Sequence, residues 1–159
     1  MPDTLETGGQ QLSLNGGGAR TRLVVRVYVA GLYLAGPSSD AAAIIAADEP
    51  MAIRLHVTSG LLTAKRMREA LVKGFNKSTD GNQAPVQTGI DQLSSLLSED
   101  ISKRDTLTLA YTPGVGTEVR RNDKPLETIA GLAFKQALFG IWLGDKPAQD
   151  NLKAGMLGQ

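Results

Sequence analysis

The sequence predicts an α+β fold built on an antiparallel sheet. The expected elements run in the order strands, helices, strands, helices, and such segregation favours an antiparallel sheet over alternating β-α-β units. The chain has 159 residues, a length that suits a single domain covering 1–159. Only 4% of the residues are aromatic while 42% are hydrophobic, so we expect a core made mainly of aliphatic side chains.

The first residues predict a short strand that ends at a glycine cluster. Residues 1–9 are polar and are expected to form an irregular lead-in, whereas 10–15 have the pattern of a strand. Gly16–Gly18 follow directly, and glycines in series permit either a tight hairpin turn or the close approach of another backbone. The turn is the simpler interpretation, so the strand is expected to stop there.

The segment 21–34 carries the strongest strand signal, because it is rich in valine and contains two tyrosines. Side chains alternate along a strand, so Arg22, Arg26 and Tyr28 share one expected face. The opposite face is apolar as far as Tyr33. We therefore expect a strand with one packed side and one partly polar side.

A helix and another strand are expected next. The turn residues 37–40 precede an alanine-rich helix over 41–47. A strand over 51–58 follows, with its aliphatic residues on one side and His56 on the other.

An amphipathic helix is predicted from Thr63 to Phe75. Thr63 is a suitable N-cap, and Leu62 and Met67 have the spacing of a hydrophobic staple. The remaining elements are expected to be a loop over 77–85, a helix over 88–99, a meander of strands over 106–112, 118–121 and 125–128, and helices over 132–143 and 150–157.

Composition excludes several kinds of site. The 17 Lys+Arg and 16 Asp+Glu give a net charge of +1, far from the basic excess of a nucleic-acid-binding protein. With one histidine and no cysteine, we expect neither a metal centre nor a disulfide. No cofactor motif is present, and no run of about 18 apolar residues predicts a transmembrane segment.

The candidate binding residues are mostly basic. A guanidinium at Arg20, Arg22 or Arg26 can bind a carboxylate through two parallel hydrogen bonds, although arginines on an exposed sheet face are more often solvated. His56 is either an ordinary sheet residue or a polar group of a pocket. Basic residues also cluster over 65–77, on a helix face that is either solvated or faces an acidic partner.

Several stretches of the chain resemble the chalcone isomerase-like family. They carry the pattern Gly-x-Gly-x-Arg, then a strand with Val-Tyr-x-x-Gly-x-Tyr, then late helical blocks similar to those of bacterial members. The stretches are Leu14–Arg20, Val27–Leu34, Ser59–Gly60, Ala133–Leu138 and Ile141–Pro147. The resemblance extends over nearly the whole chain.

The resemblance implies an open-faced β-sandwich, with helices packed on one side of a large antiparallel sheet. Arg20 matches the arginine that stabilises the oxyanion in the family's enzymes. Tyr28 matches the tyrosine that, with this arginine, grips the ligand carboxylate in the fatty-acid-binding branch. Thr63 and Ala70 stand where the enzymes carry a catalytic tyrosine and asparagine, so true chalcone cyclisation is not expected.

Function has to be argued from the site, because the family includes enzymes, fatty-acid-binding proteins and non-catalytic helpers. The favoured hypothesis is non-catalytic binding of a small apolar carboxylate by Arg20 and Tyr28, with His56 and Thr63 as further ligand-binding residues and no cofactor. An isomerase or lyase that acts on an enone, with Arg20 as oxyanion stabiliser, is the alternative. A protein-interaction module with a closed pocket is the third hypothesis.

A periplasmic location and a monomeric or weakly oligomeric state are expected. Bacterial members of the family usually carry an export signal, and this chain begins almost at its first predicted strand, as a chain without its leader would. A cytoplasmic location is the alternative.

Overall fold

The computed structural model describes all 159 residues and contains seven strands and five α-helices. The strands are β1 (Thr4–Thr7), β2 (Gln10–Arg22), β3 (Val25–Leu34), β4 (Met51–Val57), β5 (Thr106–Thr112), β6 (Gly116–Arg121) and β7 (Lys124–Ile129). The helices are α1 (Ala41–Ala46), α2 (Ala64–Ser78), α3 (Gln87–Leu96), α4 (Leu132–Leu143) and α5 (Asp150–Met156), with a 3₁₀ turn η1 at Ala84–Val86.

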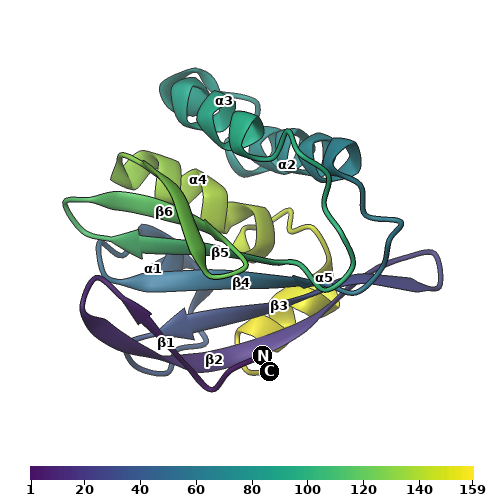
Figure 1. Cartoon of the computed structure of the whole chain (residues 1–159). Helices are drawn as coiled ribbons and strands as arrows, with labels where there is room; N and C mark the ends of the chain where they lie inside the picture. The colour runs from purple at the N-terminus through teal and green to yellow at the C-terminus, as the bar shows by residue number, and fades with distance from the viewer.

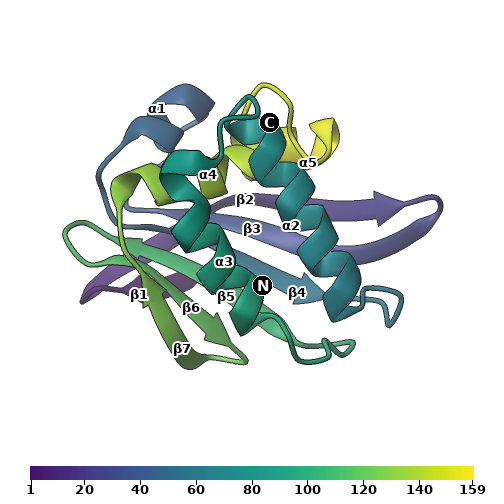
Figure 2. The ribbon, with the colours of Figure 1, turned by 90° about the horizontal axis from the view of Figure 1, so that it is seen from above.

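The strands form a single antiparallel sheet whose spatial order is the sequence order, β1 to β7. The helices are insertions or additions to this meander: α1 separates β3 from β4, α2 and α3 separate β4 from β5, and α4 and α5 follow β7. Figure 1 shows α2, α3 and α4 on one side of the sheet, and Figure 2 shows them lying across it. The predicted open-faced β-sandwich is confirmed.

The core lies between the sheet and this helical layer. The aliphatic residues of β4 on the predicted side are buried, and α4 buries nearly every residue from Phe134 onward. The stripe predicted for α2 is also buried and consists of Ala64, Met67, Leu71 and Phe75. Thr63 caps α2, since its hydroxyl accepts a hydrogen bond from the Arg66 amide at 3.2 Å. The sequence-based boundaries of α4 and β5 agree with the structure, whereas α2 extends to Ser78, into the predicted loop.

β2 differs from the prediction because it continues through the glycine cluster, and Thr4–Thr7 form β1 where an irregular lead-in was expected. A Cβ on Gly16 would lie 2.2 Å from the carbonyl oxygen of Gly155 in α5, and a Cβ on Gly155 would lie 2.5 Å from that of Gly17. No side chain fits at such distances. The hairpin-turn interpretation is therefore wrong, and the alternative of close backbone approach is confirmed.

The predicted strand over 21–34 is a hairpin instead. Arg22 pairs with Val25, so Leu23 and Val24 form a two-residue turn between β2 and β3. Neither residue is typical of a hairpin turn, so the strand pattern of the sequence continues through this position without a turn signal.

A bulge also changes which side chains of β3 share a face. Arg20 pairs with Tyr28 but Thr21 pairs with Arg26, so Val27 is an extra residue. A bulge shifts the alternation of side chains by one. Val27 and Tyr28 both reach the cavity described below while Arg26 does not, so the predicted common face of Arg26 and Tyr28 is wrong.

Candidate functional site

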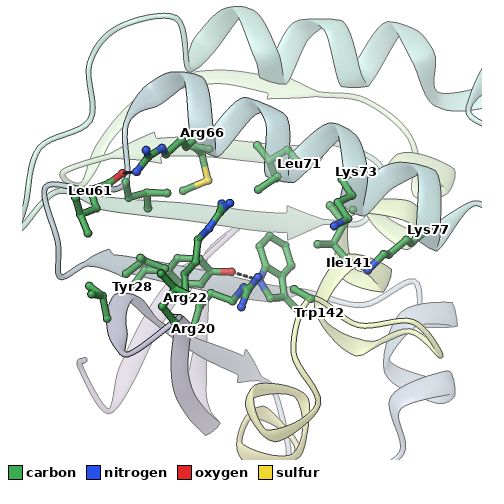
Figure 3. Close-up of a pocket in the computed structure, with 18 of the residues that line it drawn as sticks. Arg20, Arg22, Tyr28, Leu61, Arg66, Leu71, Lys73, Lys77, Ile141 and Trp142 are labelled. Carbon is green, nitrogen blue, oxygen red and sulfur yellow. Dashed lines mark hydrogen bonds between the residues drawn. The ribbon is translucent and has the colours of Figure 1, made fainter.

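A cavity of about 310 Å³ lies between the β2–β3 hairpin, α2 and the end of α4. Its volume is at the lower end of the roughly 300–1,000 Å³ typical of small-molecule sites. Most of its lining is hydrophobic and includes Val25, Val27, Leu62, Met67, Leu71 and Ile141. Figure 3 shows side chains of α2 on one side of this space and those of the sheet and α4 on the other.

Six cationic side chains and no acidic one line the cavity. They are Arg20, Arg22, Arg66, Lys73, Lys77 and Lys146. Among them only Lys146 has an acidic partner, the exposed Asp80 at 3.4 Å. Because the whole chain carries a net charge of only +1, positive charge is concentrated at this cavity, where it favours an anionic ligand.

Tyr28 places a free hydrogen-bond donor at the cavity. The ring is buried, and its oxygen accepts a hydrogen bond from the indole Nε1 of Trp142 at 3.0 Å. The phenol proton has no acceptor within the protein. Burial raises the pKa of Tyr28 despite the opposing effects of the Trp142 hydrogen bond and the Arg20 charge. The hydroxyl therefore stays protonated at neutral pH and can donate to a ligand.

Arg20 is held in place by one end of its guanidinium group. Its Nη1 donates to the Thr21 carbonyl at 2.6 Å and to Oε1 of Gln149 at 2.9 Å. Gln149 is itself fixed by donating to the Ala19 carbonyl at 3.0 Å. The Nε and Nη2 groups of Arg20 make no hydrogen bond within the protein. Arg20 is thus oriented while most of its donors remain available, next to Tyr28 (Figure 3).

The other two predicted site residues do not reach the cavity. His56 lies half-buried on the side of β4 away from the aliphatic core residues, and Thr63 is exposed at the start of α2, where its hydroxyl is used as the cap. Neither residue lines the cavity, whereas Ala70 does. Strand alternation and helix capping direct both side chains away from this cavity, and a ligand-binding role for them stays a prediction.

Trp142 is the site residue that sequence reasoning missed. It is the only tryptophan of the chain, and it is buried in α4. A buried indole N–H usually has a hydrogen-bond partner. The single tryptophan in an apolar helix was therefore the sequence feature that could have indicated this contact. The basic cluster of α2 also divides: Arg66, Lys73 and Lys77 line the cavity, whereas Arg68 donates to the Leu97 carbonyl at 2.8 Å.

A buried cation lies outside the cavity. Lys135 of α4 is fully buried, and its ammonium group donates to three backbone carbonyl oxygens. These are the carbonyls of Ile44, Ile45 and Ala47, at 2.7, 2.8 and 2.7 Å. The three donors of the lysine are therefore all used at the C-terminal end of α1, where helix carbonyls lack partners within the helix.

The chain matches the chalcone isomerase-like family model over residues 1–158. It belongs to the chalcone isomerase-like family. Among solved structures, a crystal structure of a fatty-acid binding protein of Arabidopsis thaliana is similar, with a TM-score of 0.74 and 17% sequence identity over 99% of this chain and 90% of that one. This likeness supports the fold assignment. No curated protein matches the sequence.

The chemistry available to this chalcone isomerase-like protein follows from the cavity's polar groups. They are the cations, the Tyr28 hydroxyl and the Trp142 indole, and no carboxylate or imidazole lines the space. No group of three or more His, Asp or Glu residues could hold a metal ion. None of the helices has the length and apolar character that crossing a membrane requires. The cavity is suited to holding an anion with an apolar tail.

Proposed function

We propose that this protein binds a small apolar carboxylate, such as a fatty acid, and does not convert it. The observation that carries the proposal is the pair of unused donors at an apolar cavity: the Tyr28 hydroxyl and the Nε and Nη2 groups of Arg20. A buried carboxylate is costly unless it is paired and hydrogen-bonded. Arg20 and Tyr28 together supply the charge and the donors that such a group needs.

The expected binding energies favour a ligand tail of medium length and a moderate affinity. Burying a methylene contributes about 0.8 kcal/mol, and each charge-assisted hydrogen bond adds about 1.5–3 kcal/mol. Association costs on the order of 4–15 kcal/mol. A chain of about twelve carbons, held by two or three such bonds, is then expected to bind at roughly micromolar concentration.

The family context supports the same ligand class. The Arabidopsis protein to which this chain is similar in fold is a fatty-acid binding protein. The cavity of this chain has the polarity that such a ligand requires, with apolar walls and unpaired cations.

The test is a comparison of dodecanoate with dodecanol. Trp142 lines the cavity and is the only tryptophan, so its fluorescence reports occupancy directly. Wild-type protein is expected to prefer the acid. Arg20→Ala is expected to weaken binding of the acid more than about tenfold, or 1.4 kcal/mol, while binding of the alcohol changes little.

The control variant is Lys124→Ala, which removes an exposed positive charge of β7 outside the cavity and is expected to leave both affinities unchanged. A purely structural role for Arg20 would weaken acid and alcohol equally. Equal affinity of wild type and Arg20→Ala for dodecanoate would reject the carboxylate grip.

The isomerase or lyase hypothesis stays a prediction. The free donors of Arg20 could also stabilise an oxyanion, and the lining residues that could transfer a proton are Tyr28 and the three lysines, with no carboxylate or imidazole among them. A panel of chalcones followed by absorbance tests it, and cyclisation faster than in buffer would support it. The interaction-module hypothesis and the periplasmic location also stay predictions.

A further inference from the structure

The tip of the β2–β3 hairpin is the most exposed apolar feature of the molecule. Leu23 and Val24 form the turn and are 95% and 98% exposed. Figures 1 and 2 show this hairpin projecting beyond the helices and the other strands. Single exposed apolar residues are common, but two adjacent ones at the end of a projecting hairpin present their whole side chains to the surroundings.

The backbone of this tip is strained at an apolar residue, Leu23. Leu23 has a φ of 58°, at the first position of a two-residue turn that favours glycine. The β6–β7 hairpin of the same sheet uses Asn122 and Asp123, with φ of 52° and 64°, which are residue types that tolerate this region. A bulky residue in the left-handed region is an outlier that points to function.

The charged residues of the hairpin tip itself are all positive. Arg20, Arg22 and Arg26 flank it, and the segment 20–26 has no acidic residue. None of the three arginines makes an ion pair, since the four ion pairs of the protein involve other residues. The tip therefore combines apolar side chains with unneutralised charge.

The tip also borders an exposed part of the cavity lining. Leu23 and Arg22 belong to the cavity lining, together with Leu61 and Arg66 on the α2 side. Leu61 is 52% exposed and lies in the loop before α2, so the opposite rim is also apolar and cationic. A surface that covered this rim would contact exposed residues of the cavity lining.

We propose that the hairpin tip docks the protein on an anionic lipid bilayer. Leu23 and Val24 enter the interface between headgroups and acyl chains, while Arg22 and Arg26 contact lipid phosphates. Apolar insertion and a flanking cationic patch are the two signals that together give stable, reversible membrane attachment. Docking in this orientation turns the hairpin side of the cavity toward the bilayer, so that the apolar ligand of the proposed function passes between membrane and protein without crossing water.

The absence of cysteine allows a direct test of insertion. Val24→Cys is labelled with the environment-sensitive dye NBD and mixed with vesicles of phosphatidylcholine alone or with phosphatidylglycerol. The matched control is Val115→Cys, because Val115 is also exposed (61%) but lies in the β5–β6 turn, at the opposite end of the sheet. We expect a blue shift and brightening at position 24 only, with the anionic vesicles, and reversal at high salt.

A second experiment separates docking from folding. Leu23→Gly places the favoured residue in the turn, so it is expected to maintain or raise the melting temperature. In co-flotation with the anionic vesicles, the same variant combined with Val24→Ser is expected to bind at least about tenfold more weakly than wild type. Val115→Ser is expected to bind like wild type.

Three outcomes would overturn the proposal. The first is an unchanged spectrum at position 24 with anionic vesicles. The second is equal flotation of wild type and the Leu23→Gly, Val24→Ser variant. The third is a blue shift that rises with protein concentration in the absence of vesicles, which would assign the tip to contact with a second copy of the chain. No fatty acid is added in these experiments, so their result is independent of the ligand titration.

Discussion

Two cations of the molecule, the buried Lys135 of α4 and the partly buried Arg20 of β2, have opposite roles. Lys135 uses all three of its donors on backbone carbonyls at the end of α1. Arg20 uses one nitrogen on protein acceptors and leaves its Nε and Nη2 groups free beside the Tyr28 hydroxyl. The difference is the number of donors that the protein itself satisfies.

A structural polar group differs from a binding group in whether the protein alone satisfies it. A buried charge has to be paired or hydrogen-bonded, and Lys135 meets that requirement without a ligand. Arg20 is only partly buried, and its free donors and the Tyr28 hydroxyl gain a bound acceptor when an anion enters the cavity. We therefore expect changes at Lys135 to alter stability and changes at Arg20 or Tyr28 to alter ligand affinity.

The largest expected effect is on stability and comes from Lys135→Met. The substitution fills a similar volume but leaves three carbonyl oxygens of the α1 end without a donor. We expect the free energy of unfolding to fall by at least about 3 kcal/mol, or roughly 6–12 °C in melting temperature. Dodecanoate affinity of the folded variant should match wild type. Unchanged stability would contradict the structural role.

The next effect is the dependence of binding affinity on fatty-acid length, which tests whether the tail lies in the cavity. Each pair of added methylenes is expected to strengthen binding of a saturated fatty acid by about 1.6 kcal/mol, or roughly fifteenfold. The gain should stop once the cavity of about 310 Å³ is filled. Calorimetry from octanoate to hexadecanoate measures this series. Affinity independent of length would place the tail outside the cavity.

Two tyrosines provide a matched pair for a smaller effect. Tyr28→Phe removes the free donor and is expected to weaken dodecanoate binding by about 1.4 kcal/mol, or tenfold. Tyr111→Phe removes a hydroxyl on the Lys135 side, where it donates to Asp48 at 2.6 Å, and is expected to leave the affinity unchanged. Titration with Trp142 fluorescence compares the two variants. Equal losses of dodecanoate affinity in the two variants would contradict the assignment of Tyr28 to ligand binding and of Tyr111 to the Lys135 region.

The smallest expected effect is a pH dependence of the free energy of unfolding. Burial lowers the pKa of Lys135 from its usual 10.5 to about 8, although Asp48 and Glu49 oppose the shift. Between these two values the unfolded chain binds more protons than the folded one, so the Lys135 contribution to the free energy of unfolding rises with pH across this window. Below pH 8 both states are protonated and the contribution is constant.

Urea denaturation of wild type and Lys135→Met, at roughly pH 7.5 and pH 9.5, isolates this contribution. The difference in unfolding free energy between the two proteins is expected to increase at the higher pH. A decrease would mean that the lysine holds its proton more tightly in the folded state than in the unfolded one.

Much of the fold follows from the sequence because its signals are local. The Thr63 cap, the apolar stripe of α2 and the apolar helix 132–143 were predicted from spacing alone. The glycine cluster has the local pattern of a turn, and the partner that requires it, the backbone of α5, is distant in sequence, 155 − 17 = 138 residues at the Gly17–Gly155 contact.

The site was predicted only in part, for the same reason. Arg20 and Tyr28 were found through the family pattern, and the structure places both at the cavity. The bulge at Val27 and the hydrogen bond from Trp142 depend on pairing and packing across the chain, which strand alternation cannot reveal. His56 was assigned to a pocket on chemistry alone, and chemistry does not determine which face of a sheet is covered.

A crystal structure of the protein with dodecanoate would show whether Arg20 and Tyr28 hold the carboxylate. We predict that the carboxylate lies within hydrogen-bonding distance, about 2.6–3.2 Å, of both the Tyr28 hydroxyl and the Nε or Nη2 group of Arg20, with the tail along Leu71 and Ile141. A carboxylate held at the outer lysines of α2, with the tail against Tyr28 and the donors of Arg20 still unused, would contradict the account.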